Sequence, residues 1–358
     1  MSAPQGHELR GAVIGFGLAG SVFHAPLIDS TAGLTVATIV TGNPERAAEA
    51  RANHPDADVV ADAGEVFRRS DEHDFVVVAT PNATHADLAG RSIDAGLPVV
   101  VDKPLGPDAP SAAAVAERAE RTGVMLTVFL NRRWDSDHLT IARLLAEGRL
   151  GPVTRHESRF ERWRPSLADG GAWREDTAPA DGGGVLLDLG PHLVDQVVQL
   201  HGPAASVYAE IAHRRGGRGD DDAFLAIHHE SGVESHIWAS VVAAAPGPRQ
   251  RVLGERGAYV VAGLDSQEAE LRAGKRPGGA EPWGVEPSES WGVFADGHRS
   301  ESIESEQGDW PAFYSGLERA LRSGGPPPVD PVDAVAVLAV LDAARRSAEG
   351  GTVERPPG

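Results

Sequence analysis

The sequence predicts two domains: an α/β domain of the Rossmann type with a doubly wound parallel sheet, and a C-terminal α+β domain with an open, mainly antiparallel sheet. Up to about residue 130, short apolar runs alternate with helix-length segments, as expected of buried parallel strands joined by crossover helices. Beyond residue 200, strand-like segments follow one another without intervening helices, which is typical of an antiparallel sheet. Because 358 residues exceed one ordinary domain, we place the two at 1–130 and 131–358.

The elements of the first domain follow from its apolar runs. Uninterrupted runs rich in Val and Ile predict strands at 9–14, 34–40, 58–60, 75–79, 98–101 and 125–129. Segments rich in Ala, Arg and Glu between these runs predict crossover helices at 44–53, 85–95 and 109–122.

The second domain has a different rhythm. Its first half predicts a helix at 136–147, an extended stretch at 153–162, an irregular loop at 165–184 and a helix at 185–201. Strands are then expected at 207–213, 224–229, 234–239, 250–253 and 258–261. The segment 274–305 is rich in Gly, Pro, Ser and Glu and predicts a surface loop, followed by helices at 312–322 and 331–347.

Composition excludes several kinds of site and disfavours several partners. The formal net charge of −19 repels phosphate backbones and anionic lipids, so neither nucleic acid nor a membrane is an expected partner. No cysteine is present, which excludes disulfides, thiolate metal sites and a cysteine nucleophile. The first residues are polar, and no apolar run approaches the ~18 residues of a membrane span. We therefore expect a cytoplasmic protein.

A glycine-rich turn follows the first predicted strand and opens a helix candidate. In the pattern Gly15, Gly17, Gly20, the first glycine permits a tight turn, the second lets a pyrophosphate approach the backbone, and the third lets helix and strand pack closely. The helix N-terminus offers unpaired N–H groups to the phosphates. The pattern predicts an NAD(P) site, with a glycine turn that binds nothing as the alternative. The expected cofactor-binding residues are Gly15, Phe16, Gly17, Leu18, Ala19, Gly20, Thr41, Asn43, Arg46, Thr80, Pro81, Asn82, His85, Asp102 and Lys103.

The end of the second predicted strand indicates which nucleotide is bound. An acidic residue there pairs with the ribose hydroxyls of NAD, whereas a basic one accommodates the 2′-phosphate of NADP. No acidic residue occurs at 31–44, while Thr41, Asn43 and Arg46 can donate hydrogen bonds to a phosphate. This pattern favours NADP by a small margin, because neutral donors also serve a ribose.

Lys103 is an unusual residue in this chain. Only two of the 33 lysines and arginines are lysines, and this one ends an apolar strand. Lysine can exchange a proton, whereas arginine stays charged, so the choice of lysine indicates chemistry. Ligands of doubly wound sheets bind at the carboxyl ends of strands, which places Lys103 near Thr80 and the glycine turn. The alternative role is a structural ion pair with a neighbouring carboxylate.

Asp188 and His192 are four residues apart in the helix predicted at 185–201. Residues at this spacing share a helix face, so both side chains can point into one cleft. A carboxylate beside an imidazole orients the ring, as a general base that takes an alcohol proton requires. The alternative is an ion pair on the helix surface. A zinc pair is disfavoured because no third ligand stands out, so we expect no metal.

Arginine and tryptophan occur together at 131–135, 162–164 and 173–174. Planar donors and apolar faces suit a polyol, which presents both hydroxyl groups and C–H faces, although each arginine taken alone suits a solvated loop as well. The substrate-binding residues proposed from sequence are His24, Arg133, Trp134, Arg164, Trp173, Asp188 and His192.

Taken together, these segments resemble the Gfo/Idh/MocA oxidoreductases, and within them the NADP-dependent scyllo-inositol dehydrogenase type, over nearly the whole chain. The marks are the turn at 15–20 with its continuation to 27, then 79–81, 102–104, 131–135, 162–165, 188–192 and 267–274. The resemblance implies that Lys103, Asp188 and His192 are the catalytic group, with His192 as proton acceptor and Lys103 polarising the substrate oxygen. Two departures are Asp102, where the family usually has Glu, and Asn43, where NADP-using relatives tend to have Arg.

The expected activity is hydride transfer between NAD(P) and a secondary alcohol or ketone of a small polyhydroxylated substrate, inositol-like or aldose-like. The resemblance further implies that 131–358 supplies substrate-binding and oligomer contacts, in a homodimer or homotetramer. Two alternatives stay open. One is an NAD-dependent, redox-neutral glycosidase, and the other is a non-catalytic NAD(P)-sensing protein.

Overall fold

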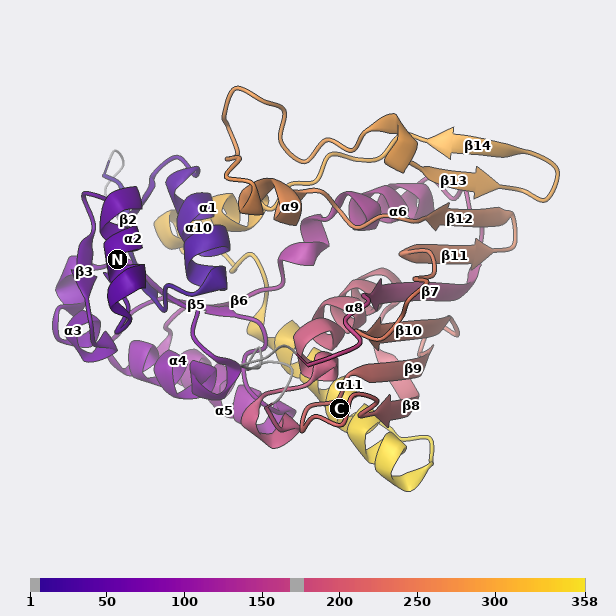
Figure 1. The fold of residues 1–358 in the computed structure, drawn as a ribbon, viewed down its shortest axis with the longest axis horizontal. Helices are drawn as coiled ribbons and strands as arrows, with labels where there is room; N and C mark the ends of the chain where they lie inside the picture. The colour runs from indigo at the N-terminus through magenta and orange to yellow at the C-terminus, as the bar shows by residue number, and fades with distance from the viewer. Residues whose placement is uncertain (1–6, 168–176, 358) are drawn as a thin grey trace.

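The computed structural model describes residues 7–167 and 177–357, which form two sheets that lie side by side (Figure 1). The first sheet is parallel and its strand order is β3-β2-β1-β4-β5-β6. This is the order of a doubly wound dinucleotide-binding fold, in which the strand order reverses beside β1. Its strands are β1 (Leu9–Ile14), β2 (Leu34–Val40), β3 (Asp58–Val60), β4 (Phe75–Val78), β5 (Val99–Asp102) and β6 (Leu126–Phe129).

Apolar side chains explain why these segments are strands. All four residues of β4 are completely buried, as expected of a central parallel strand with helices on both faces. Between the strands lie the crossover helices α2 (Pro44–Asn53), α3 (Ala63–Arg68), α4 (His85–Asp94) and α5 (Ala109–Thr122), while a π-helical turn (Ala19–His24) runs into α1 (Ala25–Asp29). The parallel Rossmann sheet predicted from the sequence is confirmed.

The second sheet has the order β14-β13-β12-β11-β7-β10-β9-β8 and is antiparallel except where β7 pairs with β10. Its strands are β7 (Val153–Glu161), β8 (Ala204–Ala212), β9 (Asp222–His229), β10 (Glu234–Ser240), β11 (Gln250–Gly254), β12 (Gly257–Val261), β13 (Gly292–Ala295) and β14 (Ser300–Ile303). Helix α6 (Ser136–Ala146) precedes this sheet, α8 (Val185–His201) contacts its strands β7, β9 and β10, and α9 (Gln267–Arg272) is a short helix after β12.

One sequence prediction about this sheet is wrong. The segment 274–305 is not all surface loop, because β13 and β14 form a hairpin that extends the sheet beyond β12. The hairpin is amphipathic and largely exposed at the sheet edge, so its few apolar residues give a weak pattern. Its strand structure depends on cross-strand contacts such as Tyr259 opposite Phe294.

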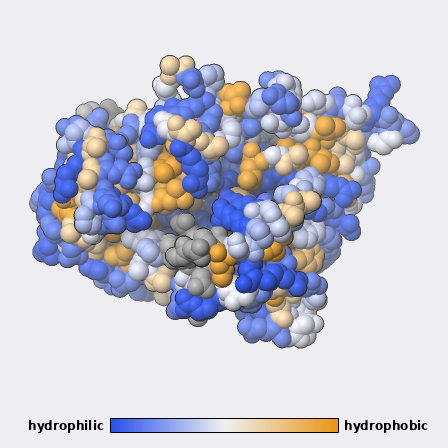
Figure 2. All heavy atoms as spheres, viewed as in Figure 1, coloured by the Kyte–Doolittle hydropathy of each residue, from blue (hydrophilic) through white to orange (hydrophobic). Residues whose placement is uncertain are grey.

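The C-terminal helices connect the two halves. Helix α10 (Pro311–Ser323) contacts α1 of the Rossmann half, and α11 (Pro331–Gly350) contacts α5 and β6 as well as α8 and β8. Consequently the largest buried apolar cluster runs through both halves without interruption. Hydrophilic side chains cover most of the face seen in Figure 2. No helix in the described ranges is long and apolar enough to cross a membrane.

Candidate active site

The glycine turn has the geometry that a dinucleotide needs. Gly15 has φ +100°, and a side chain there would place its Cβ 2.5 Å from the carbonyl oxygen of Ala79. A Cβ on Gly20 would collide with the carbonyl oxygen of Gly15, so this glycine lets the helix meet the turn. At Gly17 the nearest atom to such a Cβ is 3.7 Å away, on Arg46, so this face of the turn is open. The turn therefore fits a pyrophosphate, which would approach the backbone at Gly17.

A cleft begins at this turn and contains the three residues that the resemblance assigns to catalysis. Its wall includes Leu18 and Ala19 of the turn, Lys103 directly after β5, and Asp188 and His192 on α8. Lys103 and His192 are far apart in sequence but face one cavity because α8 lies across the carboxyl end of the parallel sheet. The structure thus brings the three side chains together next to the expected cofactor site.

Asp188 pairs with Lys103. The Nζ of Lys103 lies 3.0 Å from Oδ1 of Asp188 and also donates a short hydrogen bond to the backbone carbonyl of Asp188. Both side chains are partly exposed to the cleft. These contacts join Asp188 to the lysine, and the orientation of the His192 ring by this carboxylate stays a prediction. The i,i+4 spacing of Asp188 and His192 could not predict a contact with Lys103, which belongs to the other half of the molecule.

His192 is buried and its Nδ1 contacts no polar partner among the described residues. Burial lowers its pKa well below the usual 6.5, and the charges of Lys103, Arg132, Arg249 and Arg162 lower it further. The ring is therefore neutral at pH 7. A neutral imidazole in the wall of the cleft can accept a proton from a bound hydroxyl group.

His85 fastens the two strand ends that frame the cleft. This fully buried ring has Nδ1 2.7 Å from the carbonyl oxygen of Pro104 and Nε2 2.8 Å from that of Thr80. The Lys103–Pro104 peptide bond is cis. His85 was expected to contact the cofactor, but its buried contacts make it a positioning residue for the segments after β4 and β5.

Other expected cofactor residues have structural contacts of their own. Asn82 is buried and its Nδ2 donates to the carbonyl of Gly182 at 2.8 Å, which ties the Rossmann half to the segment before α8. Thr80 and Thr84 share a hydrogen bond of 2.7 Å between their hydroxyl groups, near the surface. Asp102 accepts a hydrogen bond from the N–H of Lys103 at 2.9 Å and lines the cleft. Phe16 is buried, with its ring 5.9 Å from that of His54.

Several residues expected to bind substrate lie outside the cleft wall. Arg133 forms ion pairs with Asp195 at 2.6 Å and with Asp333 at 2.9 Å. Trp134 places its ring edge against Phe313, at 6.0 Å between centroids. His24 is buried beneath Asp102, and its Nδ1 lies 2.6 Å from the Tyr314 hydroxyl. Arg164 is exposed, and Trp173 lies outside the described residues.

The cleft wall instead uses neighbours of those residues. Asn131 and Arg132 line it in place of Arg133 and Trp134, and Arg162 lines it in place of Arg164. The sequence signal identified the right segments, since all three belong to the Arg/Trp groups. Seven further residues of the wall were not among the site residues predicted from sequence, namely Phe23, Phe129, Phe160, Leu189, Glu268, Arg272 and Trp310.

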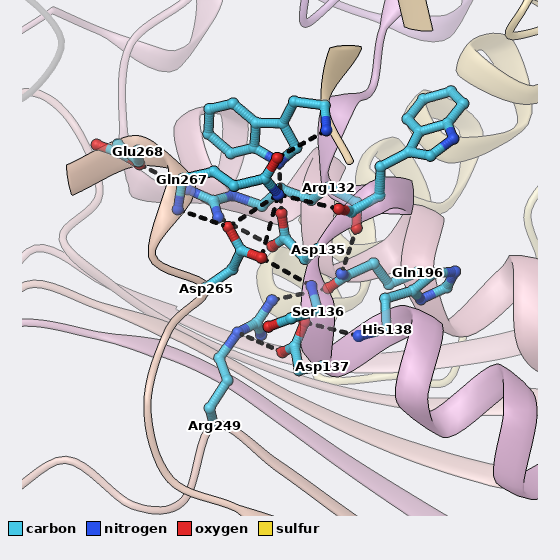
Figure 3. Close-up of polar contacts among 12 residues, drawn as sticks. Arg132, Asp135, Ser136, Asp137, His138, Gln196, Arg249, Asp265, Gln267 and Glu268 are labelled. Atoms are coloured by element: carbon cyan, nitrogen blue, oxygen red, sulfur yellow. Dashed lines mark hydrogen bonds and ion pairs between the residues drawn. The ribbon is translucent and has the colours of Figure 1, made fainter. Parts of the chain in front are cut away.

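A buried ionic network supports this wall (Figure 3). Arg132 lies between Asp135, at 3.0 Å, and Glu268, at 2.7 Å. Below it, Asp265 accepts hydrogen bonds from the N–H groups of Ser136 and Gln267. Burial raises the pKa of Asp265 to about 6, an effect that these hydrogen bonds only partly offset. The network fixes the orientation of Arg132 relative to α9.

A second recess lies at the end of β2, where the adenosine end of a dinucleotide would be expected. Thr41, Asn43 and Arg51 line it, and no acidic residue is part of its described lining. The Asn43 side chain caps α2 by accepting a hydrogen bond from the N–H of Arg46 at 3.0 Å. Arg46 itself is exposed and reaches back toward Gly17. Within the described ranges, no group of three or more His, Asp or Glu is placed to hold a metal ion.

Two family descriptions match the chain. Residues 9–130 match the oxidoreductase family with an NAD-binding Rossmann fold, and residues 138–260 match the GFO/IDH/MocA C-terminal domain. The chain belongs to the Gfo/Idh/MocA oxidoreductase family. This confirms the resemblance drawn from the motifs, and with it an oxidoreductase that has an NAD(P)-binding domain.

Relatives within the family match over nearly their full length. The uncharacterized oxidoreductase YdgJ of Escherichia coli is 37% identical, with 96% of this chain and 97% of that protein covered. The scyllo-inositol 2-dehydrogenase (NADP(+)) IolW of Bacillus subtilis is 30% identical, with 95% and 94% covered. A solved oxidoreductase structure from Yersinia pestis superposes with a TM-score of 0.90 at 34% identity and covers 99% of this chain and 98% of that one.

Proposed function

We propose that this oxidoreductase oxidises a secondary alcohol of a polyol or sugar with NADP, through Lys103, Asp188 and His192. One observation carries the proposal: the Lys103–Asp188 pair and the neutral His192 line a single cleft that starts at the glycine turn. The names of two relatives support the substrate class, the inositol dehydrogenase IolW and a D-apiose dehydrogenase of Paraburkholderia graminis, which is 28% identical with 80% of this chain and 74% of that protein covered.

The mechanism assigns one task to each residue. NAD(P), bound at the glycine turn, would supply the hydride chemistry of the reaction. His192 takes the hydroxyl proton, since its ring is neutral and lies in the wall of the cleft. Lys103 donates a hydrogen bond to the same oxygen and stabilises the negative charge that develops there. Asp188 holds the lysine side chain in position through the ion pair. Ketone reduction uses the same groups in reverse.

NADP is the proposed nucleotide because of the side chains around the end of β2. Arg46 lies beside Gly17 and forms no ion pair with a described carboxylate, so it can pair with a 2′-phosphate. The absence of an acid from the described lining of this recess leaves the ribose hydroxyls of NAD without the usual acceptor. Thr41 and Asn43 add neutral donors.

The test is a screen of inositols, aldoses and sugar derivatives for reduction of NAD or NADP, followed by absorbance of the reduced nicotinamide. Lys103→Met and His192→Ala are each expected to abolish turnover while nucleotide affinity changes little. Product formation without a net absorbance change would replace this proposal with the redox-neutral glycosidase. Nucleotide binding without any turnover would replace it with the sensing protein.

We also propose a homodimer or homotetramer, which is the assembly that the resemblance implies. Light scattering coupled to size-exclusion chromatography tests it, since a single 37.5 kDa species at working concentrations would contradict it.

A further inference from the structure

Arg162 is the residue of the cleft wall that the proposed mechanism does not use. It directly follows β7. Two backbone hydrogen bonds fix its main chain: its N–H donates to the carbonyl of Ser240 at 2.8 Å, and its carbonyl accepts from the N–H of Ala243 at 3.0 Å. The guanidinium lies 4.7 Å from the centroid of the Phe160 ring. Its charge also acts on His192, whose pKa it helps to lower. Arg162 is therefore held on a rigid strand end close to the proposed proton acceptor.

The other described cations of the wall are paired with carboxylates. The pairs are Arg132 with Asp135 and Glu268, Arg272 with Glu268, and Lys103 with Asp188 (Figure 3 shows the first of these). Arg162 differs from them, because its guanidinium forms no ion pair or hydrogen bond with any described residue. Glu268 and Asp188 act on it only through longer-range attraction.

An unpaired cation in a partly buried wall affects which ligands bind well. Burial lowers the pKa of Arg162, as do the nearby charges of Arg164 and Arg132, yet a guanidinium remains charged at neutral pH. A neutral ligand that covers this group would remove its water without replacing the lost hydrogen bonds, which is unfavourable. An anionic oxygen pair would replace them with charge-assisted bonds in the planar geometry that arginine prefers.

We propose that Arg162 binds a carboxylate of the substrate, so that the polyol oxidised here is a polyhydroxy acid. The inference rests on the proposed function, whose substrate class it narrows. A carboxylate fits better than a phosphate because a phosphate monoester carries close to two negative charges at neutral pH. Among the described residues the wall offers one unpaired cation, and Asp102, Asp188 and Glu268 also lie along it and repel a second negative charge.

The experiment compares pairs of ligands that differ only in the acidic group. D-glucose and D-glucuronate form one pair, D-galactose and D-galacturonate another, and D-glucose 6-phosphate represents the phosphate. Each is titrated calorimetrically into the full chain saturated with NADP, and each is then assayed for turnover. The variants are Arg162→Gln, Arg162→Lys and the control Arg155→Gln, which makes the same charge change at an exposed position of the same strand. Circular dichroism confirms that the variants are folded.

The wild-type chain is expected to bind at least one uronate about tenfold or more tightly than its neutral partner, the scale of a desolvated charge pair. Arg162→Gln should abolish the preference for the uronate and keep any affinity for neutral sugars within about twofold of the wild-type value. Arg162→Lys should retain part of the preference. Arg155→Gln should change neither the preference nor the affinity for neutral sugars. Equal binding within each pair, no uronate binding, tighter binding of the phosphate, or an Arg162→Gln variant that keeps the preference would each overturn the inference. If uronates bind through Arg162 and no nicotinamide is reduced, the dehydrogenase proposal fails while the assignment of Arg162 stands.

Discussion

The Nζ of Lys103 lies 3.0 Å from Oδ1 of Asp188, which joins the end of a strand in the parallel sheet to a helix of the second half. This ion pair spans the cleft wall and lies beside the neutral His192. It holds the lysine in the place from which the proposed mechanism has it contact a substrate oxygen, and it provides a counter-charge for a side chain that is only 15% exposed. Removing either partner leaves the other without its charge partner in a partly desolvated site.

Lys103→Met is expected to lower kcat by about a hundredfold or more, because a positioned charge at the developing oxyanion is lost. Nucleotide affinity, measured by fluorescence titration with NADPH, should stay within about threefold, since the glycine turn is intact. The chain provides a matched control in Lys275→Met, its other lysine, which pairs with Glu270 in the segment after α9. A comparable loss of kcat in both variants would show that the effect is not specific to the cleft.

In the proposed mechanism, His192 determines how alcohol oxidation responds to acid. Burial and nearby cations place the pKa of His192 well below 6.5, so the ring stays neutral when the pH is lowered from 8 to 6. The rate of alcohol oxidation should therefore change little over this range because of His192. The rate should fall only at lower pH, when the imidazole becomes protonated and can no longer accept a proton. His192→Gln should lower kcat by about a hundredfold or more and remove this acidic limb. A variant with the wild-type pH profile would assign the proton transfer to another group.

Arg46→Ala is expected to raise the KM for NADP by about tenfold or more and to leave the KM for NAD nearly unchanged. The reason is that the guanidinium beside Gly17 would lose its charge-assisted bonds only to the nucleotide that carries a 2′-phosphate. Initial rates at varied concentrations of each nucleotide measure the ratio. Arg121→Ala, at an exposed position on α5, is the control. An equal effect on both nucleotides would mean that Arg46 contacts the shared pyrophosphate.

Three buried histidines, one each in α6, β7 and α8, should make the fold sensitive to acid. Burial lowers the pKa of His138 and His156 to about 4 and that of His201 to about 2. The unfolded chain therefore binds more protons than the folded chain below pH 6.5, so stability is complete above that pH and is lost as the pH falls toward 4. Within this window, each such histidine lowers the free energy of unfolding by about 1.4 kcal/mol for each unit by which the pH falls.

Thermal unfolding between pH 8 and 5 measures this effect as a falling Tm. Asp265 acts in the opposite direction, because its raised pKa of about 6 makes the folded state bind an extra proton between about pH 4 and 6. Other buried groups also act in both directions, since His85 and His229 have lowered pKa values and Asp195 and Asp220 have raised ones, so the histidine contribution is measured by comparing variants. His156→Gln should flatten the profile, whereas His228→Gln, at an exposed histidine, should not. The same dependence of Tm on pH in the wild-type chain and in His156→Gln would contradict the assignment.

Local sequence patterns predicted most of the fold. The bounds of β1, β2, β3, α2, α5 and α8 agree with the predicted ranges, because each segment carries a long apolar pattern or a clear capping residue. Asp108, for example, caps α5 by accepting a hydrogen bond from the N–H of Ser111. The β13–β14 hairpin could not be predicted, because few of its residues are buried and its strands are defined by pairing with β12.

The candidate site was predictable as a set of segments rather than as a set of contacts. The family resemblance grouped Lys103, Asp188 and His192, but local sequence patterns could not show that Asp188 pairs with a lysine 85 positions away. They also did not show which arginine of each group faces the cleft. Arg133 and Arg162 have similar sequence surroundings, yet the first is tied to Asp195 and the second is not tied to any described carboxylate. Such differences depend on tertiary contacts.

The return of the C-terminal helices to the Rossmann half affects how the polypeptide can be divided. Phe313 and Tyr314 of α10 pack against Phe129, at 4.9 and 6.0 Å between ring centroids, and the Thr127 hydroxyl donates to the carbonyl of Val329. A fragment cut at residue 130 would expose these apolar rings of the nucleotide half to water and leave the His24 ring without its phenol partner. The nucleotide half is continuous in space but not in sequence, so a gene fragment that encodes only the first third of the chain does not encode a complete folding unit.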